Sequence, residues 1–336
     1  MLTELTQKLI AKENLTFDRA QDALKLILAG QCEPVAIAAF LTALAAKGET
    51  AIEVAGLAQA MRDHAVPVKP QAKGLIDIVG TGGDGSSTFN ISTTAALVVA
   101  GAGVKVAKHG NRAITSQCGS ADILAELGVK IDATPETIAR CIDEANIGFM
   151  FAPNHHPAMK YVQPIRKALG FRTVFNILGP LANPAGVPAQ FTGVARPELV
   201  AVMVEALKLL GVRRAMVVHG DGMDEISISG PTQIAHLREG VITHDAIEPE
   251  RLGITPASAG TLVGGSLGEN AAITRDILDG SESGPRRDVV LINAAGALMV
   301  IEKAGSFEEG IKLAAESIAE GRAVEALEKL VEISNS

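Results

Sequence analysis

The sequence is poor in aromatic residues and in positive charge. It has no tryptophan and one tyrosine, aromatic residues make up 3% of the chain, and the formal net charge is −8 at pH 7. Proteins that bind nucleic acids depend on lysines and arginines that contact phosphates, and single-strand binders also stack bases on aromatic rings. The composition therefore argues against a nucleic-acid-binding function.

Long hydrophobic runs and paired cysteines are also missing. The longest apolar run, Ala95 to Val104, is much shorter than the roughly 20 residues of a membrane-spanning helix. The N-terminal residues show no basic region followed by an apolar one, so we expect no secretory signal and no membrane association. Cys32, Cys118 and Cys141 fit neither a disulfide framework nor a metal-ligand spacing. We expect a cytoplasmic protein with reduced thiols.

The chain is rich in hydrophobic residues, which make up 47% of its 336 positions. That is enough for one large domain or two unequal ones. Apolar residues at helical spacing mark the segment before Val66 as helical, and Thr50 with Glu53 predicts a capping box for a helix over Ala51–Arg62. Val66–Gly74, which contains two prolines, has the composition of a linker.

Beyond the linker, short apolar runs with strand character alternate with helical ones. The expected strands are Leu75–Val79, Val104–Ala107, Gly148–Ala152 and Ala215–Val218. The expected helices are Thr93–Ala102, Ala121–Leu127, Pro135–Ala145, Glu198–Leu210, Val289–Ala304 and Phe307–Glu320. This alternation predicts an α/β fold with a mostly parallel central sheet, in which ligands bind beyond the carboxyl ends of the strands.

The first expected strand runs into four glycines within six residues, Gly80, Gly82, Gly83 and Gly85. Such a turn can gather backbone N–H groups into a concavity that binds anions. Asn90 or Ser92 can cap the next helix, whose N-terminus also attracts phosphate. The loop thus predicts phosphate or diphosphate binding. Its G-x-G-x-x-G spacing lacks the helix start and acidic residue of a dinucleotide site, and a ligand-free turn is the plainer alternative.

Two charged clusters follow other expected strands. The loop Lys108–Arg112 carries two permanent cations and a histidine, and the pair Asp224 and Glu225 follows Ala215–Val218. Taken singly, each cluster is also typical of a solvated surface turn. Together with the glycine loop they favour a shared anion and a magnesium ion that bridges to its phosphates. The combination predicts chemistry driven by positioning and charge.

These motifs, in this order, resemble the anthranilate phosphoribosyltransferase family of tryptophan biosynthesis over essentially the whole chain. The segments that carry the resemblance are Gly80–Asp84, Asn90–Thr93, Lys108–Arg112, Arg166, Phe175–Pro184 and Gly222–Glu225. The resemblance implies a glycosyltransferase that moves the 5-phosphoribosyl group of phosphoribosyl diphosphate (PRPP) to the amine of anthranilate and uses magnesium, two ions per monomer. A nucleoside phosphorylase of the same fold and a non-enzymatic nucleic-acid-binding paralogue are the alternatives.

The resemblance also implies a division of the chain. An all-helical domain would comprise residues 1–68 joined by about 162–183, and a larger α/β domain that binds PRPP would comprise residues 75–161 and 184–336. The active site would lie in the cleft between the two domains. The chain would form a homodimer through the helical domain.

Position by position, the resemblance assigns substrate and metal contacts. The expected PRPP contacts are Gly80, Gly83, Asp84, Thr88, Asn90, Ile91, Ser92, Thr93, Lys108, His109, Gly110, Asn111, Arg112, Ala113, Ile114, Thr115, Ser116 and Ser120. The expected anthranilate contacts are Gly80, Asn111 and Arg166, with His109 and Pro153 at the border. The expected magnesium ligands are Ser92, Asp224 and Glu225. No catalytic acid or base is expected, because the arylamine is already nucleophilic and the departing diphosphate is stabilised by charge.

Overall fold

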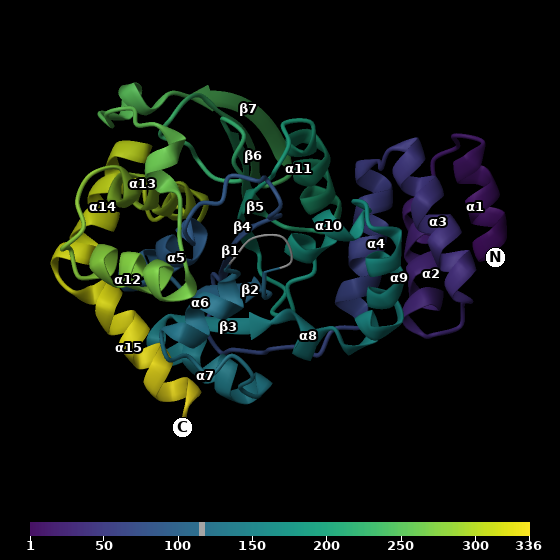
Figure 1. Ribbon diagram of the computed structural model, residues 1–336, viewed down its shortest axis with the longest axis horizontal. Coiled ribbons are helices and arrows are strands. Elements are labelled where there is room, and N and C mark those ends of the chain that lie inside the picture. The colour runs from purple at the N-terminus through teal and green to yellow at the C-terminus, as the bar shows by residue number, and fades with distance from the viewer. Residues whose placement is uncertain (114–117) are drawn as a thin grey trace.

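The computed structural model describes residues 1–113 and 118–336. Figure 1 shows a small helical lobe at the N-terminal end beside a larger α/β lobe. The helical lobe begins with α1 (Leu2–Ile10), α2 (Phe17–Leu28), α3 (Pro34–Lys47) and α4 (Ala51–Asp63). The predicted capping box of α4 is confirmed: the Thr50 side chain accepts the N–H of Glu53, and the Glu53 side chain accepts the N–H of Thr50.

A middle segment of the chain, Val162–Asn183, packs on these helices. It contains α9 (Gln163–Leu169), α10 (Phe175–Leu178) and a 3₁₀ turn, Gly179–Leu181. Its apolar side chains lie in the same hydrophobic core as those of α1–α4, and the contributors include Val162, Ile165, Val174, Phe175, Leu178 and Leu181. α9 contacts α3 and α10 contacts α4, as Figure 1 also shows.

The α/β lobe is built on a seven-stranded sheet with the order β3-β2-β1-β4-β5-β6-β7. The strands are β1 (Ile76–Gly80), β2 (Val106–Gly110), β3 (Ile147–Phe151), β4 (Ala189–Gly193), β5 (Arg214–Gly220), β6 (Thr232–Arg238) and β7 (Val241–Ile247). β1 to β5 are parallel, and β6 and β7 extend the sheet antiparallel, so the prediction of a mostly parallel sheet is confirmed. The strand order reverses between β1 and β4, which is where such sheets bind ligands.

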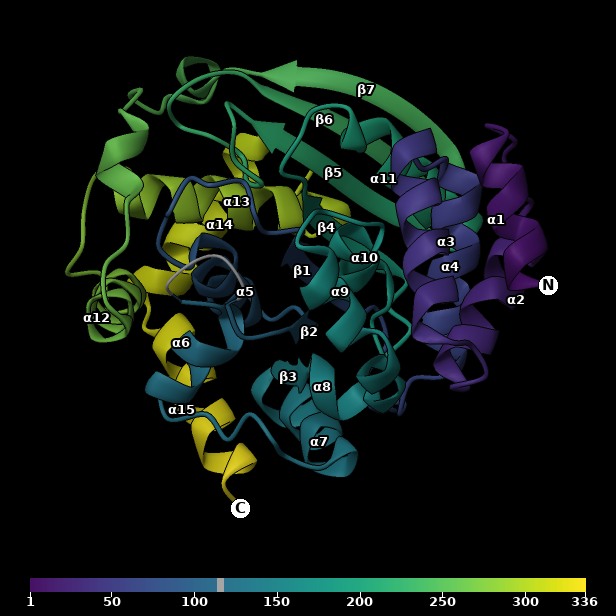
Figure 2. The ribbon, with the colours of Figure 1, turned by 45° about the vertical axis from the view of Figure 1, so that its right-hand side comes forward.

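Helices cover both faces of the sheet. α5 (Ile91–Gly101) contacts β1, and α13 (Pro285–Val300) contacts β4 and β5, while α11 (Leu199–Leu209) lies between the sheet and α4. In Figure 2, β5, β6 and β7 run side by side past α13 towards the helical lobe. The remaining helices are α6 (Ser120–Glu126), α7 (Pro135–Ala145), α8 (Ala152–His155), α12 (Leu267–Leu278), α14 (Phe307–Ala319) and α15 (Arg322–Ser334). Within the described ranges, no helix has both the length and the apolar character needed to cross a membrane.

One predicted boundary is wrong and bears on the site. The sequence predicts a loop from Lys108 onwards, but β2 continues through Lys108, His109 and Gly110, which pair with β3. The Lys108 ammonium donates to the carbonyl of Ile78, and the His109 N–H donates to the carboxylate of Asp77. A strand can therefore carry these polar residues into the interior, because their hydrogen bonds are made there.

Candidate active site

The glycine loop follows β1 and precedes α5. Gly82, Gly83 and Gly85 have φ angles of +67°, +71° and +80°, a region that side chains disfavour. The N–H groups of Gly83, Asp84 and Gly85 donate to no acceptor in the described part of the chain. Three consecutive unpartnered N–H groups in a glycine turn form the kind of nest that holds an oxyanion.

Contacts on two sides hold this loop. The Gly82 N–H donates to Oδ2 of Asp224 at 2.7 Å, and Nη2 of Arg172 donates to the carbonyl of Gly83. Within the loop, the Asp84 carboxylate accepts the N–H and the hydroxyl of Ser86, at 3.1 and 2.7 Å. The loop is therefore shaped before any ligand arrives.

Glycines also end four of the strands that lead to the site: Gly80, Gly110, Gly193 and Gly220. A Cβ at Gly80 would overlap the Asp224 carboxylate, and one at Gly193 would overlap the Asp224 backbone. The absence of side chains lets the segment after β5 lie directly against the ends of β1 and β4. This close approach brings the predicted acidic pair to the glycine loop.

Three carboxylates meet at this point. The Asp224 N–H donates to Oδ2 of Asp84 at 3.4 Å, and Oε1 of Glu225 accepts the N–H of Ser92 at 3.0 Å. Oε2 of Glu225 is buried and has no hydrogen-bond partner among residues 1–113 and 118–336. Burial and the charge of Asp84 raise the pKa of Asp224 to about 7. Burial and the charge of Asp224 raise the pKa of Glu225 well above its ordinary value.

This carboxylate cluster suits a cation that neutralises it. In residues 1–113 and 118–336, no three His, Cys, Asp or Glu side chains are placed to enclose a metal by themselves. A metal here would complete its shell with water, the Ser92 hydroxyl or substrate oxygens. Magnesium binds in that way, through one or two carboxylates and the phosphates of a substrate.

Lys108 lies beneath the loop. Its Nζ donates to the carbonyl of Ile78 at 2.6 Å, and the residue is 2% exposed. Burial lowers the pKa of Lys108, while the nearby charges of Asp77 and Glu225 raise it. Its positive charge therefore acts from below the site rather than from the surface.

His109 is buried next to Lys108. Its Nδ1 lies 3.2 Å from the carbonyl of Gly179, on the middle segment, and its Nε2 has no partner in the described part of the chain. Burial and the neighbouring His156 lower the pKa of His109 to about 3. The ring is therefore neutral at pH 7, with the Nδ1 proton directed at Gly179 and Nε2 left as an acceptor.

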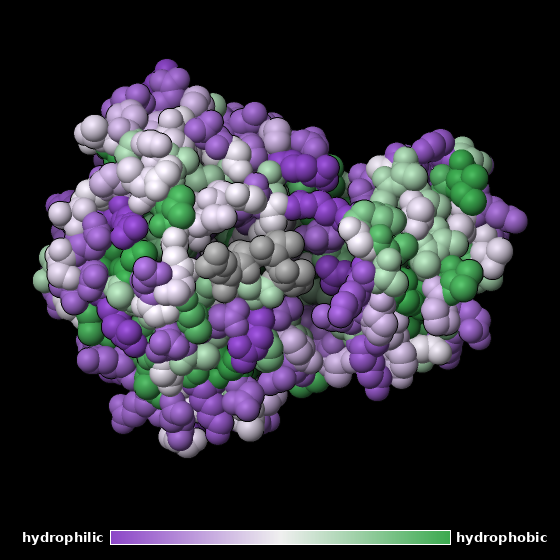
Figure 3. All heavy atoms as spheres, viewed as in Figure 1, coloured by the Kyte–Doolittle hydropathy of each residue, from purple (hydrophilic) through white to green (hydrophobic). Residues whose placement is uncertain are grey.

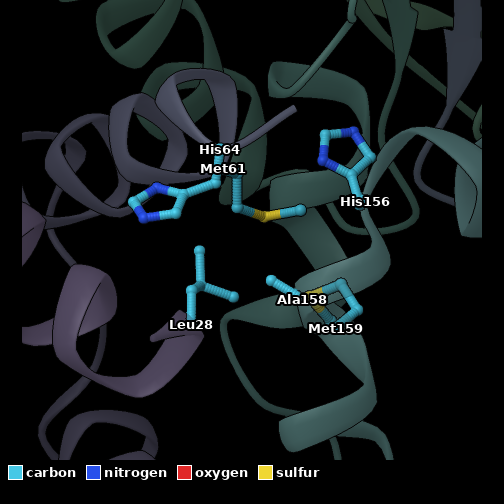
Figure 4. A pocket seen from close by; sticks show the side chains of 6 residues that line it. All are labelled: Leu28, Met61, His64, His156, Ala158 and Met159. Carbon is cyan, nitrogen blue, oxygen red and sulfur yellow. The ribbon is translucent and has the colours of Figure 1, made fainter. Parts of the chain in front are cut away.

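A small pocket lies next to His156, whose ring is a neighbour of His109 (Figure 4). It is lined by Leu28, Met61, His64, His156, Ala158 and Met159. The His109 and His156 rings meet at a centroid distance of 5.2 Å. With a volume of about 10 Å³, the pocket has room for about one water molecule. It is too small to admit a substrate.

A larger cavity of about 670 Å³ lies elsewhere, at the amino end of β5. Arg214, His236 and Met299 are among its lining residues, and none of the predicted site residues is. The glycine loop instead lies at the carboxyl end of the sheet. Figure 3 shows a hollow where the two lobes meet, with hydrophilic side chains beside it.

Three of the predicted acceptor residues, Arg166, Asn111 and Pro153, come from different parts of the chain. Arg166, on α9, holds its guanidinium 5.4 Å from the ring centre of Phe175 and makes no side-chain hydrogen bond within the described ranges. Burial lowers the pKa of Arg166. Asn111 follows β2 and Pro153 lies in α8, directly after β3. Among the described residues, no hydrogen bond or ion pair joins the Arg166 side chain to the glycine loop.

The helix start behind the loop differs from the sequence prediction. Asn90 occupies the N-cap position of α5 without a side-chain capping bond, because its amide donates to the carbonyl of Cys118. Its Oδ1 is buried and has no partner in the part of the chain that the structure describes. Ile91 and Thr93 are buried in the first turn, so only their backbone can face a ligand. Thr88 forms an isolated bridge with Val263.

The remaining predicted PRPP contacts surround the end of β2. Arg112 forms an ion pair with Asp122 at 2.7 Å, which directs its side chain towards α6. The Ala113 N–H also donates to Asp122, and the Ser120 hydroxyl donates to the carbonyl of Asn111. The predicted contacts at Ile114, Thr115 and Ser116 lie outside the described residues.

Comparisons with known proteins cover both lobes. Residues 3–65 match the helical bundle domain, and residues 72–324 the a/b domain, of the glycosyl transferase family. An anthranilate phosphoribosyltransferase from Thermomicrobium roseum is 50% identical over 341 aligned positions, which cover 100% of this chain and 98% of that protein. The chain belongs to the anthranilate phosphoribosyltransferase family. It is therefore an enzyme, a glycosyltransferase of tryptophan biosynthesis, as the sequence predicts.

Solved anthranilate phosphoribosyltransferases have the same fold. The one from Thermus thermophilus has a TM-score of 0.94 and 44% identity, with 99% of each chain covered. The one from Saccharomyces cerevisiae, solved in complex with PRPP and Mg, has a TM-score of 0.92 and 32% identity, with 99% of this chain and 98% of that chain covered. These relatives support the transferase and neither of the two alternatives.

Proposed function

We propose that the chain transfers the 5-phosphoribosyl group of PRPP to the amine of anthranilate at the site around the glycine loop, with release of diphosphate. The observation that carries this proposal is the contact between two features. The three unpartnered N–H groups of Gly83–Gly85 offer an anion site, and Asp84, Asp224 and Glu225 beside them offer a cation site. A metal-bound diphosphate is the ligand class that satisfies both.

Magnesium fits the donor set. Ser92, Asp224 and Glu225 would hold it, and the buried Oε2 of Glu225, which has no hydrogen-bond partner among the described residues, suits a metal ligand. When bound, magnesium stabilises the negative charge of a departing diphosphate. Because Asp84 adds a third carboxylate, we propose two ions per monomer. The S. cerevisiae relative solved with PRPP and Mg supports this use of the metal.

The chain's own groups position the donor. The nest N–H groups and the N-terminus of α5 would bind the diphosphate, and the residues after β2, with Ser120, would bind the phosphoribosyl part. The Lys108 ammonium, 2.6 Å from the carbonyl of Ile78, adds positive charge beneath them. These groups stabilise charge that grows as the C1′–oxygen bond breaks, so no acid is needed to release diphosphate.

The acceptor would bind on the other side of the cleft. The Arg166 guanidinium, which has no hydrogen-bond partner in the described part of the chain, is proposed to take the anthranilate carboxylate through two parallel hydrogen bonds. Gly80 and Asn111 would complete the site, with His109 and Pro153 at its border. His109 stays neutral at pH 7 because its pKa is lowered to about 3, so it brings no competing positive charge.

The division into domains is part of the proposal. Residues 1–68 with 162–183 would form the helical domain, and residues 75–161 with 184–336 the PRPP-binding domain. The helical domain is also the proposed homodimer surface, because exposed apolar side chains lie on it, among them Ile10, Val35 and Phe171. Figure 3 shows hydrophobic patches on that lobe. As a biosynthetic enzyme, it is proposed to act in the cytoplasm.

One assay tests the proposed function directly. Purified protein is mixed with anthranilate, PRPP and Mg²⁺, and the fluorescence of anthranilate is followed. We expect a loss that requires all three additions. Turnover of a pyrimidine nucleoside with inorganic phosphate, without loss of anthranilate, would support the phosphorylase instead. A salt-sensitive shift of DNA at near-physiological ionic strength would support the nucleic-acid-binding alternative.

A further inference from the structure

Arg172 connects the two lobes across the site. It lies between α9 and α10, on the middle segment whose neighbouring Val174 and Phe175 are buried in the core of the helical lobe. Its Nη2 donates to the carbonyl of Gly83, which belongs to the glycine loop of the α/β lobe. Gly83 allows this approach because a Cβ there would overlap the guanidinium.

This contact fixes the direction of one peptide group in the loop. In a trans peptide, the C=O of one residue and the N–H of the next point in opposite directions. When Arg172 holds the Gly83 carbonyl on its own side, the Asp84 N–H must point the other way. On the preceding side of the loop, the Gly82 N–H is held by Asp224 at 2.7 Å. Two peptides of a flexible glycine turn are thus oriented from outside the loop.

We propose that Arg172 is a positioning residue for the diphosphate of PRPP. It presets the glycine loop so that the free N–H of Asp84, which lies between those of Gly83 and Gly85, faces the ligand before it binds. This role rests on the proposed function of the site. A guanidinium suits the task, because one N–H can hold the carbonyl while the others and the positive charge remain near the anion.

The test compares Arg172→Ala, Arg172→Lys and a matched control, Lys167→Ala. Lys167 is exposed on α9 and makes no side-chain hydrogen bond within the described ranges, so its removal deletes a charge from the same segment without touching the loop. In Arg172→Ala we expect the KM for PRPP to rise about tenfold, since a charge-assisted hydrogen bond is lost. The KM for anthranilate and the Tm should stay unchanged, Lys should restore part of the effect, and the control should match wild type.

Hydrogen–deuterium exchange supplies a readout that does not depend on turnover. Without substrate, the amides of residues 81–89 should exchange faster in Arg172→Ala than in wild type or Lys167→Ala. Titration of Mg²⁺ and inorganic diphosphate, followed by calorimetry, should show weaker binding in the same variant. These two measurements still decide the role of Arg172 if wild-type protein fails to consume anthranilate, a result that would sink the proposed function itself.

The proposal fails under three results. An unchanged KM for PRPP in Arg172→Ala would show that the contact with Gly83 does not contribute to PRPP binding. The same rise in Lys167→Ala would assign the effect to the general charge of the segment. A lower Tm with equal rises in both KM values would make Arg172 a structural residue of the middle segment.

Discussion

At the scale of single residues, the site contains charged groups that lack some of the hydrogen bonds or ion pairs they could make. Glu225 is 7% exposed, accepts the Ser92 N–H, and leaves its second oxygen without a partner. Leaving a buried charge unpaired costs stability. Such a group is retained where a bound ligand compensates its charge. We therefore expect the acidic pair to lower the stability of the ligand-free protein and to bind a cation.

This cost gives a prediction for Asp224→Asn combined with Glu225→Gln. We expect kcat/KM to fall by about a hundredfold or more, because the charge that holds the metal is removed. Excess EDTA should abolish turnover of the wild type, and full activity in EDTA would contradict the metal site.

The raised pKa values mean that the carboxylates destabilise the folded protein as the pH rises towards about 7. The metal-free variant should therefore lose less Tm than metal-free wild type between pH 5 and 8.

Arg166 gives a second prediction at this scale. A charge-assisted pair with a carboxylate contributes about 1.5–3 kcal/mol, so Arg166→Ala should raise the KM for anthranilate roughly ten- to a hundredfold. The KM for PRPP should change far less. Lys should rescue only in part, because an ammonium cannot make the planar two-point contact. Steady-state kinetics with each substrate varied in turn will decide, and equal losses for both substrates would point to a structural role.

At the scale of elements, the glycine loop requires glycine for two different reasons, a positive φ angle and a lack of space for a Cβ. Gly82 and Gly83 both have positive φ, but only Gly83 also faces a side chain, that of Arg172. Valine at either position resists the left-handed conformation. We expect Gly82→Val and Gly83→Val to abolish the binding of PRPP, with little change in the KM for anthranilate. Normal PRPP binding in either variant would refute the anion nest.

The elements also show which parts of the fold the sequence could predict. Helices with clear caps were predictable: α7 has the expected bounds, Pro135–Ala145, and α4 has its capping box. β4 was not, because Gln190 and Thr192 interrupt its apolar pattern. Both side chains are buried all the same, since the Gln190 amide donates to the carbonyl of Pro180 and to the Thr192 hydroxyl. Hydrogen bonds of this kind cannot be predicted from the spacing of apolar residues in the sequence.

The same reasoning applies to the candidate site. Its glycine loop and acidic pair were predictable, because local composition already suits them to their ligands. Arg172 was not, because a single arginine becomes informative only when the middle segment places it against Gly83. The substrate contacts and the domain boundaries stay predictions.

At the scale of the whole molecule, exposed apolar residues of the helical lobe are the basis of the proposed homodimer. Val35 is 80% exposed and Ile10 is 68% exposed, both on the helical lobe. Such side chains favour a partner surface when they gather on one lobe. If this lobe forms the homodimer, Val35→Glu with Ile10→Glu should shift the protein from dimer to monomer without unfolding it. Light scattering after size exclusion measures the mass, and Val241→Glu, on edge strand β7, is the control that should leave it unchanged.

The return of the middle segment to the N-terminal helices has a consequence for synthesis on the ribosome. Chains fold as they emerge, N-terminal parts first. Here α1–α4 emerge early, yet the core they share with Val174, Phe175 and Leu178 cannot close until the first three strands of the sheet have also been made. The apolar face of α1–α4 that the middle segment covers therefore stays exposed until that segment has been made. Apolar surface exposed in this way favours aggregation, so a stall in translation before the middle segment would leave an aggregation-prone nascent chain.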